Sequence, residues 1–234
     1  MDLQKEIQHL SSLQGITYLG FGELPKAGEA GNSNRTAERE RYLNVISLGI
    51  SLPDAVVDQL PSRFDAGNAI NYKHHAYDII NLRLDLAASL IAGHLQQNGY
   101  SALPIPASKQ IDQEKMYGAF SHKMAAGLSG LGWIGKSTLL ITPAHGPRVR
   151  WASILTEAPL ASPVSPLKSK CGECTACRDI CPSKAIKGTR FEADKPRENQ
   201  LDVHACEGYL EKMKTALGVD VCGMCLYICP FGKK

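Results

Sequence analysis

The feature that most constrains this chain is a cysteine motif near its C-terminal end. It reads Cys171-Gly-Glu-Cys174-Thr-Ala-Cys177-Arg-Asp-Ile-Cys181-Pro182. The spacing C-x2-C-x2-C-x3-C-P is typical of cysteines that bind [4Fe-4S] clusters. The first three thiolates hold one cluster, whereas the fourth normally binds the other cluster of a pair. The motif therefore predicts a second cluster, with ligands elsewhere in the chain.

A second motif supplies most of those ligands. It reads Cys222-Gly-Met-Cys225-Leu-Tyr-Ile-Cys229-Pro230, which repeats the last three cysteines of the first motif and its proline. Val219 stands where a first cysteine would be, and the one cysteine still unassigned is Cys206. The four cysteines of the first motif, the three of the second and Cys206 account for all eight cysteines. We predict two ligand sets: Cys171, Cys174, Cys177 and Cys229 for the first cluster, and Cys181, Cys206, Cys222 and Cys225 for the second.

Disulfides and zinc are the alternative uses of these cysteines. Disulfides suit small exported domains, but the N-terminal sequence MDLQKEIQHL lacks the apolar core of a signal peptide. Zinc sites use paired C-x2-C units. A third cysteine after two residues and a fourth after three, followed by proline, favours iron and sulfide over zinc.

The distribution of the cysteines also predicts the domain organisation. All eight lie after position 170 of 234 residues, so the earlier residues must fold around an ordinary apolar core. The segment from Ala158 to Pro166 contains three prolines. We expect an α+β protein with a mixed α/β domain over 1–160 and a ferredoxin-like two-cluster domain over 161–234. No stretch approaches about 20 consecutive apolar residues, so we expect a cytoplasmic protein without a membrane partner.

Net charge is +3, and the excess lies in the cysteine-rich part. From position 161 onward there are 12 Lys/Arg and 9 Asp/Glu, against 14 and 14 before it. We interpret these cations as offsetting the negative charge of cluster and thiolates. No basic run interleaved with aromatic residues indicates nucleic-acid binding.

Apolar periodicity predicts the elements of the first 160 residues. We expect a short helix over 2–14, strands over 16–21 and 45–52, a surface loop over 25–41, a long helix over 68–97, a strand over 100–106, a helix over 116–129, and strands over 138–142 and 149–156. The long helix should bury Tyr72, Ala76, Ile79, Ile80, Leu86, Ala87, Leu90, Ile91 and Leu95.

The stretch Gly130-Leu-Gly-Trp-Ile-Gly135-Lys136-Ser137 matches the phosphate-loop pattern G-x4-G-K-[ST]. Such a loop follows a buried strand and opens a helix, whose free amide groups bind phosphate. Here a predicted helix precedes the motif, and a strand-like stretch ending at Pro143 follows it. The context argues against ATP binding.

The same stretch read longer, GLGWIGKSTLLITP over 130–143, together with Ile154-Leu-Thr and both cysteine motifs, resembles the epoxyqueuosine reductase family. The likeness extends from about Tyr72 to Phe231. It includes the segment 202–210, which resembles the family's segment with a lone cluster ligand and so accounts for Cys206. The family is similar to the corrinoid-dependent reductive dehalogenases. The resemblance implies that two [4Fe-4S] clusters supply electrons to a cobalamin on which a substrate is reduced.

The resemblance also implies that the 132–142 segment lines the corrin ring. Trp133 and Leu140 would provide apolar contact, Lys136 or Thr138 would donate hydrogen bonds, and Gly223 would allow close approach of the backbone. Plain core packing is the alternative for Trp133, and a tight turn is the alternative for Gly223. Two histidines on the long helix, His74 and His75, are more typical of surface or core residues than of cobalt ligands.

Two departures from the family limit the implied activity. The family's catalytic aspartate lies fourteen residues before the first glycine of the 130–143 motif, where this sequence has Met116. Asp112 is a possible substitute, and Glu114 and Tyr117 also lie nearby. Longer family members grip tRNA with a C-terminal helical-repeat extension, whereas this sequence ends at Lys234.

We therefore expect an oxidoreductase that is not an efficient epoxyqueuosine reductase, with tRNA an unlikely partner. Its substrate would be a small molecule or the corrinoid itself, and reduced ferredoxin or flavodoxin would donate the electrons. The alternative is a ferredoxin-like electron-transfer protein without corrinoid.

Overall fold

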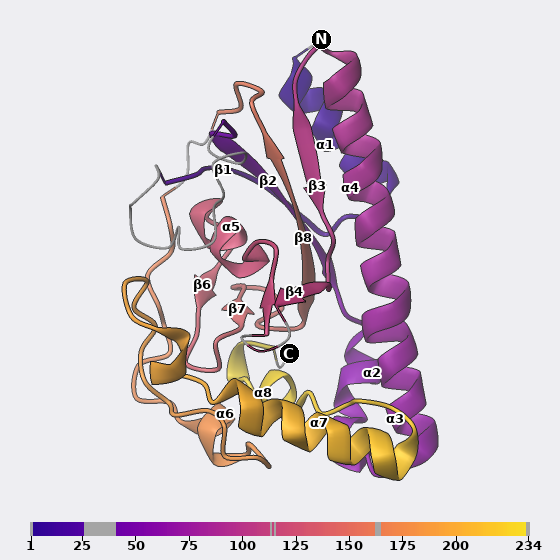
Figure 1. The fold of residues 1–234 in the computed structure, drawn as a ribbon, viewed down its shortest axis with the longest axis vertical. Coiled ribbons are helices and arrows are strands. Elements are labelled where there is room, and N and C mark those ends of the chain that lie inside the picture. Colours follow the sequence, from indigo (N-terminus) through magenta and orange to yellow (C-terminus); the bar gives the residue numbers. More distant parts are fainter. Residues whose placement is uncertain (1, 26–40, 113, 115, 162–164, 233–234) are drawn as a thin grey trace. The chain divides into compact units, whose positions relative to one another are not determined.

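The fold comes from a computed structural model, which describes residues 2–25, 41–112, 114, 116–161 and 165–232. It is an α+β protein, as expected (Figure 1). Most of the predicted surface loop over 25–41 lies outside the described residues. The helices are α1 (Leu3–Leu13), α2 (Asp54–Asp58), α3 (Ala66–Lys73), α4 (Ile80–Gln97), α5 (His122–Leu128), α6 (Ala176–Asp179), α7 (Val203–Leu217) and α8 (Met224–Tyr227). Short 3-10 turns are η2 (Leu60–Ser62), η4 (Arg197–Asn199) and η5 (Pro230–Gly232).

Four strands form the main sheet in the order β1-β2-β8-β3: β1 (Tyr18–Glu23), β2 (Asn44–Ser51), β8 (Val149–Thr156) and β3 (Ala102–Ile105). β1 runs antiparallel to β2, and β3 runs antiparallel to β8. Residues 45–50 of the central strand β2 are all buried, as a strand covered on both faces requires. α4 runs beside the sheet in Figure 1. The predicted strand, helix and strand occur along the chain as β2, α4 and β3. In the sheet, β8 lies between β2 and β3.

The long helix differs from the prediction in one physical detail. It covers 66–97, but residues His74–Ile79 between α3 and α4 form a π-helical turn, η3. A π turn adds a residue to the helix and so rotates the following side chains around its axis. Ile79, Leu86 and Leu90 are exposed, contrary to expectation, and Leu84 and Ala88 are buried instead. The other predicted core positions of the helix are buried.

The helix predicted over 116–129 is wrong in its first half. α5 covers only His122–Leu128, and the side chain of Ser121 accepts a hydrogen bond from the Met124 N–H (3.4 Å) to cap it. A capping serine favours a helix start at that point. Before it, β5 (Tyr117–Gly118) pairs with β4 (Gln110–Asp112). Met116 has a left-handed backbone conformation (φ +53°) that a helix cannot contain.

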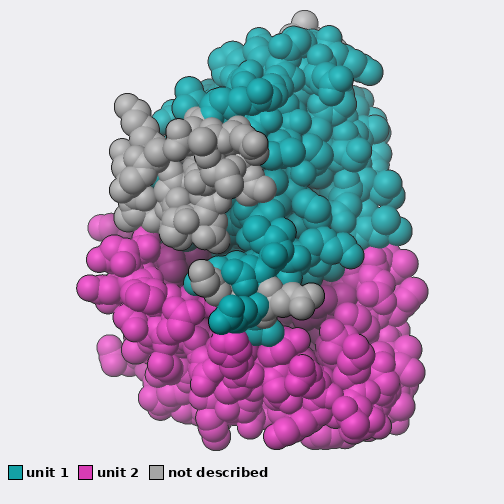
Figure 2. All heavy atoms as spheres, in the orientation of Figure 1, with its two compact units in different colours: residues 1–50, 81–132, 150–167 teal, residues 51–80, 133–149, 168–234 magenta. Residues whose placement is uncertain are grey.

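Two compact units are shown in different colours in Figure 2. The first comprises 1–50, 81–132 and 150–167, and holds the main sheet. The second comprises 51–80, 133–149 and 168–234, and holds all eight cysteines. We expected contiguous domains over 1–160 and 161–234; two earlier segments instead join the cysteine-rich segment. These segments contribute buried apolar side chains such as Leu60, Tyr72 and Ile141. Among the described residues, no helix has the length and apolar character needed to cross a membrane.

Candidate iron–sulfur centres

The first predicted ligand set lines one hollow in the second unit. Cys171 and Cys174 come from the loop before α6, Cys177 comes from α6 itself, and Cys229 comes from the turn before η5. Other residues of the lining are Lys136, Ser137, Ile141, Ala176, Pro230 and Phe231. The fold thus brings Cys229 to the three cysteines of the other motif, as the sequence predicts.

The glycine-rich stretch forms a wall of this hollow. β6 (Trp133–Ile134) and β7 (Leu140–Ile141) pair as an antiparallel hairpin. A Cβ atom on Gly135 would lie 2.8 Å from Ile141 Cγ1 and 3.4 Å from Cys171 Sγ, so the backbone passes close to the thiols. Lys136 Nζ donates a hydrogen bond to the carbonyl oxygen of Cys174 (3.2 Å). Because a strand follows the motif, it does not have the strand-to-helix geometry of a phosphate loop.

Three cysteines of the second predicted set meet at a small apolar cluster. Cys181, Ala185 and Ile186 are buried together, and Cys206 and Cys225 pack against them, as does Cys177 of the first set. Cys206 lies on α7, whose N-terminal cap is Asp202, the acceptor of the Ala205 N–H (2.9 Å). The Asp202 N–H in turn donates to the carbonyl of Ala185 (2.9 Å). The lone cysteine is therefore tied by backbone contacts to the end of the first motif.

Electrostatic interactions divide the thiols in the same way. Burial, and then the negative charges of Cys222 and Cys181, raise the pKa of Cys206 to about 11. Burial, and then the charges of Cys171, Cys177 and Cys174, raise the pKa of Cys229 to about 11. Burial also raises the pKa of Cys225 far above its usual range, and nearby thiolates add to it. The raised pKa values favour the protonated thiols, so metal binding would release their protons.

Cys181 is buried and behaves differently from the partly buried thiols Cys206, Cys225 and Cys229. Burial by itself raises its pKa, but hydrogen bonding from Ser183 and from the backbone amides of Ile186, Ala185 and Ser183 outweighs burial and lowers it. Its Sγ lies 3.5 Å from Ser183 Oγ. Hydrogen bonds to a thiolate stabilise the charged form that a metal requires. The turn after the first motif therefore prepares Cys181 as a ligand.

Arg63 is a neighbour of the second set that sequence reasoning missed. Its side chain is buried and donates from Nη2 to Tyr209 Oη on α7 (2.9 Å). Burial raises the pKa of Cys222, while the charge of Arg63 opposes that rise. A cation beside thiolates helps to hold them charged. Arg63 lies far from every cysteine in the sequence and belongs to no motif, so nothing local could have indicated it.

Gly223 lies between Cys222 and Cys225 in a left-handed conformation (φ +68°). A Cβ atom there would lie 2.7 Å from Leu60 Cδ1 and 2.9 Å from Tyr72 Oη. The backbone at Gly223 therefore comes close to protein side chains. This packing is enough to require a glycine here, without contact to a cofactor.

The other residues predicted to contact a corrin ring lie in the β6–β7 hairpin. Trp133 and Leu140 are 3% and 2% exposed, and the Trp133 ring packs edge-to-face on Phe231 (5.0 Å between centroids). Thr138 is buried with φ +61°. Lys136 remains partly exposed at the first hollow. These side chains build the hairpin in this structure, so their contact with a corrin stays a prediction.

The residues near the family's acid position belong to the first unit. Asp112 is partly buried at the end of β4, opposite Tyr117, and Glu114 is exposed. His74 and His75 are exposed on the π turn with their rings 5.0 Å apart, which fits the surface alternative.

Comparison with known proteins identifies the class of the cysteine-rich segment. Residues 170–232 match the family model of the 4Fe-4S double cluster binding domain. The cysteine-rich segment is therefore a double-cluster iron–sulfur domain, as its two motifs predict.

Curated relatives confirm the wider resemblance. The chain is 26% identical to the epoxyqueuosine reductase of Lactococcus garvieae over 264 residues, which cover 99% of this chain and 70% of that protein. It is 32% identical to that of Bacillus anthracis over 127 residues, and 39% identical to that of a Synechococcus strain over 113 residues. These two matches span only 30% and 34% of those proteins.

Solved structures show the same fold. A selenomethionine-labelled epoxyqueuosine reductase aligns with a TM-score of 0.62 at 17% identity, covering 98% of this chain and 65% of that one. A catabolic reductive dehalogenase in complex with 3-bromo-4-hydroxybenzoic acid aligns with a TM-score of 0.67 at 19% identity, covering 97% and 31%. The chain is thus similar in sequence to epoxyqueuosine reductases, and it shares its fold with them and with a reductive dehalogenase.

Proposed function

We propose that this protein is an oxidoreductase that passes electrons from two [4Fe-4S] clusters to a bound cobalamin, for reduction of a small molecule or of the corrinoid itself. The observation that carries the proposal is that four cysteines line one hollow, while Cys181, Cys206, Cys222 and Cys225 interact electrostatically within the same compact unit. The relationship to epoxyqueuosine reductases supports the reductase class.

The proposed ligands of the first cluster are Cys171, Cys174, Cys177 and Cys229. Four sulfur atoms on one hollow match the ligand number of a [4Fe-4S] cluster. The apolar side chains of Ile141 and Phe231 would exclude water from it, and the Lys136 ammonium would add positive charge at its rim. Hydrogen bonds and charge near the sulfurs set the potential of such a centre.

The proposed ligands of the second cluster are Cys181, Cys206, Cys222 and Cys225. Each cysteine motif gives its last cysteine to the other set, so the two sets are adjacent; the charges of Cys225 and Cys177 already interact. Arg63 would balance part of the thiolate charge. Adjacent clusters provide a short path for electrons within the unit.

A bound cobalamin would supply a cobalt ion that accepts these electrons and reduces the substrate. The five predicted contact residues do not present an open apolar face in this structure: Trp133, Thr138 and Leu140 are buried, and only Lys136 and Gly223 are partly exposed. This arrangement favours the second candidate, an electron-transfer protein without corrinoid. The relationship to known reductases favours the first.

In our proposal this protein differs from its named relatives in lacking an acid that donates a proton to the substrate from position 116. A positioned acid contributes roughly 10²–10⁴ in rate to a step that needs a proton, and the thioether of Met116 has no proton to give. Glu114 is nearer in sequence but exposed, so the partly buried Asp112 is the carboxyl group that we propose as a replacement. We propose a substrate that needs no proton from this position, reduced ferredoxin or flavodoxin as electron donor, and no role for tRNA.

Absorption spectroscopy under anaerobic conditions tests the cobalamin proposal. Protein with both clusters would be mixed with one equivalent of aquacobalamin, and unbound corrinoid would be removed by gel filtration. Retained corrinoid bands that change on reduction of the clusters support the proposal. Protein that elutes with full cluster absorbance and no corrinoid would instead establish the electron-transfer alternative.

The variant Cys206→Ser separates binding from electron transfer in this assay. It removes one ligand of the second cluster but no residue predicted to contact the corrin. It should retain cobalamin and reduce it more slowly than the wild type.

A further inference from the structure

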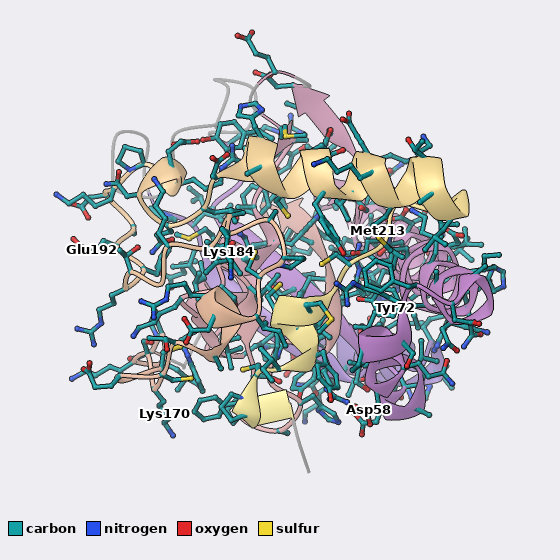
Figure 3. All side chains as sticks on the ribbon, turned by 90° about the horizontal axis from the view of Figure 1, so that it is seen from below. Asp58, Tyr72, Lys170, Lys184, Glu192 and Met213 are labelled. Atoms are coloured by element: carbon teal, nitrogen blue, oxygen red, sulfur yellow. The ribbon has the colours of Figure 1, made fainter. Side chains whose placement is uncertain are left out.

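A second, open hollow lies immediately after the first cysteine motif. Arg178, Asp179, Lys184, Ile186 and Lys187 line it, and Lys184 is labelled in Figure 3. Ile186 is 5% exposed and belongs to the apolar cluster that contains Cys181. The floor of the hollow is therefore in contact with a proposed ligand of the second cluster.

The rim of this hollow carries excess positive charge. Asp179 is already balanced, because it pairs with Arg178 Nε (2.8 Å) and accepts a hydrogen bond from Thr175 Oγ1 (2.6 Å). Lys184 and Lys187 are both exposed. Within the described ranges, no carboxylate lies within 4.0 Å of either ammonium group; Lys184 Nζ contacts only the backbone carbonyl of Asp179 (3.4 Å). Three cations and one carboxylate thus line the hollow, which leaves a net charge of +2.

Backbone contacts hold these two lysines in place. The Lys184 N–H donates to the carbonyl of Cys181 (3.2 Å), and the Lys187 N–H donates to the carbonyl of Gln200 (2.9 Å). Lys184 has a left-handed backbone conformation (φ +54°). Gly188 packs against Arg178, since a Cβ atom there would lie 3.0 Å from Arg178 Cδ. The rim is therefore a fixed part of the cluster-binding turn.

We propose that this hollow is the docking site of a small acidic electron-carrier protein of the ferredoxin or flavodoxin class. The inference rests on the proposed function and deepens it by assigning a surface to the electron donor. Opposite charges steer two proteins together and fix their orientation. The carrier loses one electron on docking and the second cluster gains it; no bond is made or broken, and no proton is transferred.

The lining favours a protein partner over RNA. Unpaired bases are usually bound by stacking on aromatic side chains, and none of the residues that line this hollow is aromatic. The aliphatic Ile186, flanked by two ammonium groups and a guanidinium, instead matches an apolar patch surrounded by carboxylates.

A matched pair of double variants tests this docking site. Lys184→Asn with Lys187→Gln removes both charges, and asparagine tolerates the left-handed backbone at position 184. Lys212→Gln with Lys214→Gln makes the same change in net charge at exposed positions of α7 and serves as the control. Two quantities are measured for each protein with flavodoxin as the probe: the second-order rate constant of cluster reduction by stopped flow, and the Kd of oxidised flavodoxin by calorimetry.

At low ionic strength the Lys184/Lys187 variant should show a fall of about 10-fold in rate constant and a similar rise in Kd, because charge complementarity accelerates association by about 10–10³. The control should stay within about twofold of wild type. Both differences should disappear at high salt, which screens exposed charges.

Several outcomes would overturn the docking site. Equal effects of the two double variants would show that only net charge matters. Slower reduction of the Lys184/Lys187 variant by a small neutral reductant, photoreduced deazaflavin, would indicate a damaged cluster instead of lost docking. Weakened tRNA binding with unchanged flavodoxin binding would assign the hollow to RNA. Wild-type protein that contains no iron would refute the proposed function. In that case the Kd of flavodoxin, measured by calorimetry, would still test whether the hollow is a docking surface.

Discussion

Replacement of Gly146 by alanine should damage the first cluster site through a steric clash. Gly146 has φ +53°, and its N–H and carbonyl both bond with the backbone of Thr142. A Cβ atom there would lie 2.4 Å from the backbone nitrogen of Gly232 and 2.6 Å from the carbonyl carbon of Phe231. These are backbone atoms of the turn that follows Cys229, so no side-chain rotation can relieve the clash.

The magnitude follows from two contributions. The left-handed conformation costs a non-glycine residue roughly 1–2 kcal/mol. Overpacking a well-packed interior costs about 1–3 kcal/mol more. Gly218→Ala is the matched control, because Gly218 has φ +79° but no atom within 4 Å of its Cβ position, so it includes only the first contribution. The second contribution corresponds to about 2–12 °C of additional loss in apparent Tm for a protein of this size.

Differential scanning calorimetry on anaerobic protein measures this difference, and electron paramagnetic resonance on the reduced variants reports cluster content. Gly146→Ala should lose apparent Tm relative to Gly218→Ala and should lose the first cluster preferentially, since the displaced turn carries Cys229. Equal Tm and full cluster content in both variants would refute the reasoning that this turn is held by close backbone packing.

Three further predictions concern other parts of the molecule. Cys206→Ser should lose one cluster while the other remains visible by electron paramagnetic resonance; two intact clusters would show that Cys206 is not a ligand. Burial lowers the pKa of His122, whose ring nitrogens contact Ser153 Oγ and the Pro106 carbonyl. The unfolded state therefore binds the proton first, so the apparent Tm should fall as pH drops below about 6.5 towards the folded-state pKa, and His122→Gln should reduce that fall. Anaerobic incubation with epoxyqueuosine-containing tRNA, cobalamin and a strong reductant should leave the epoxide intact; rapid conversion to queuosine would contradict this and make Asp112→Asn the next variant.

The parts of the fold that the sequence predicts are those with a local signal. Alternating or continuous apolar residues place β2 and β8, and the stop at Asn98-Gly99 places the end of α4. The π turn carries no such signal, because it changes the register by a single residue. Leu86 and Leu90 were expected in the core and are exposed, because the apolar residues of this helix cover a wider stripe than the face that it buries.

The candidate site also has one part that the sequence predicts and one part that it does not. Motif spacing predicts the grouping of the cysteines, because cluster geometry imposes that spacing on the chain. It does not predict the supporting residues. Arg63 and the β6–β7 hairpin reach the cysteines only through tertiary packing, which also explains why the second unit contains segments far from the motifs. Trp133 illustrates the limit: its position in the motif suggested a cofactor contact, and the structure packs it on Phe231.

The central claim is that eight cysteines hold two [4Fe-4S] clusters in this chain, and metal analysis tests it most directly. Anaerobically purified protein would be assayed for iron, acid-labile sulfide and zinc, each per polypeptide. Two four-iron clusters require about eight iron and eight sulfide per chain, with no stoichiometric zinc. Zinc in place of iron, or about four iron and four sulfide per chain after full reconstitution, would contradict the account.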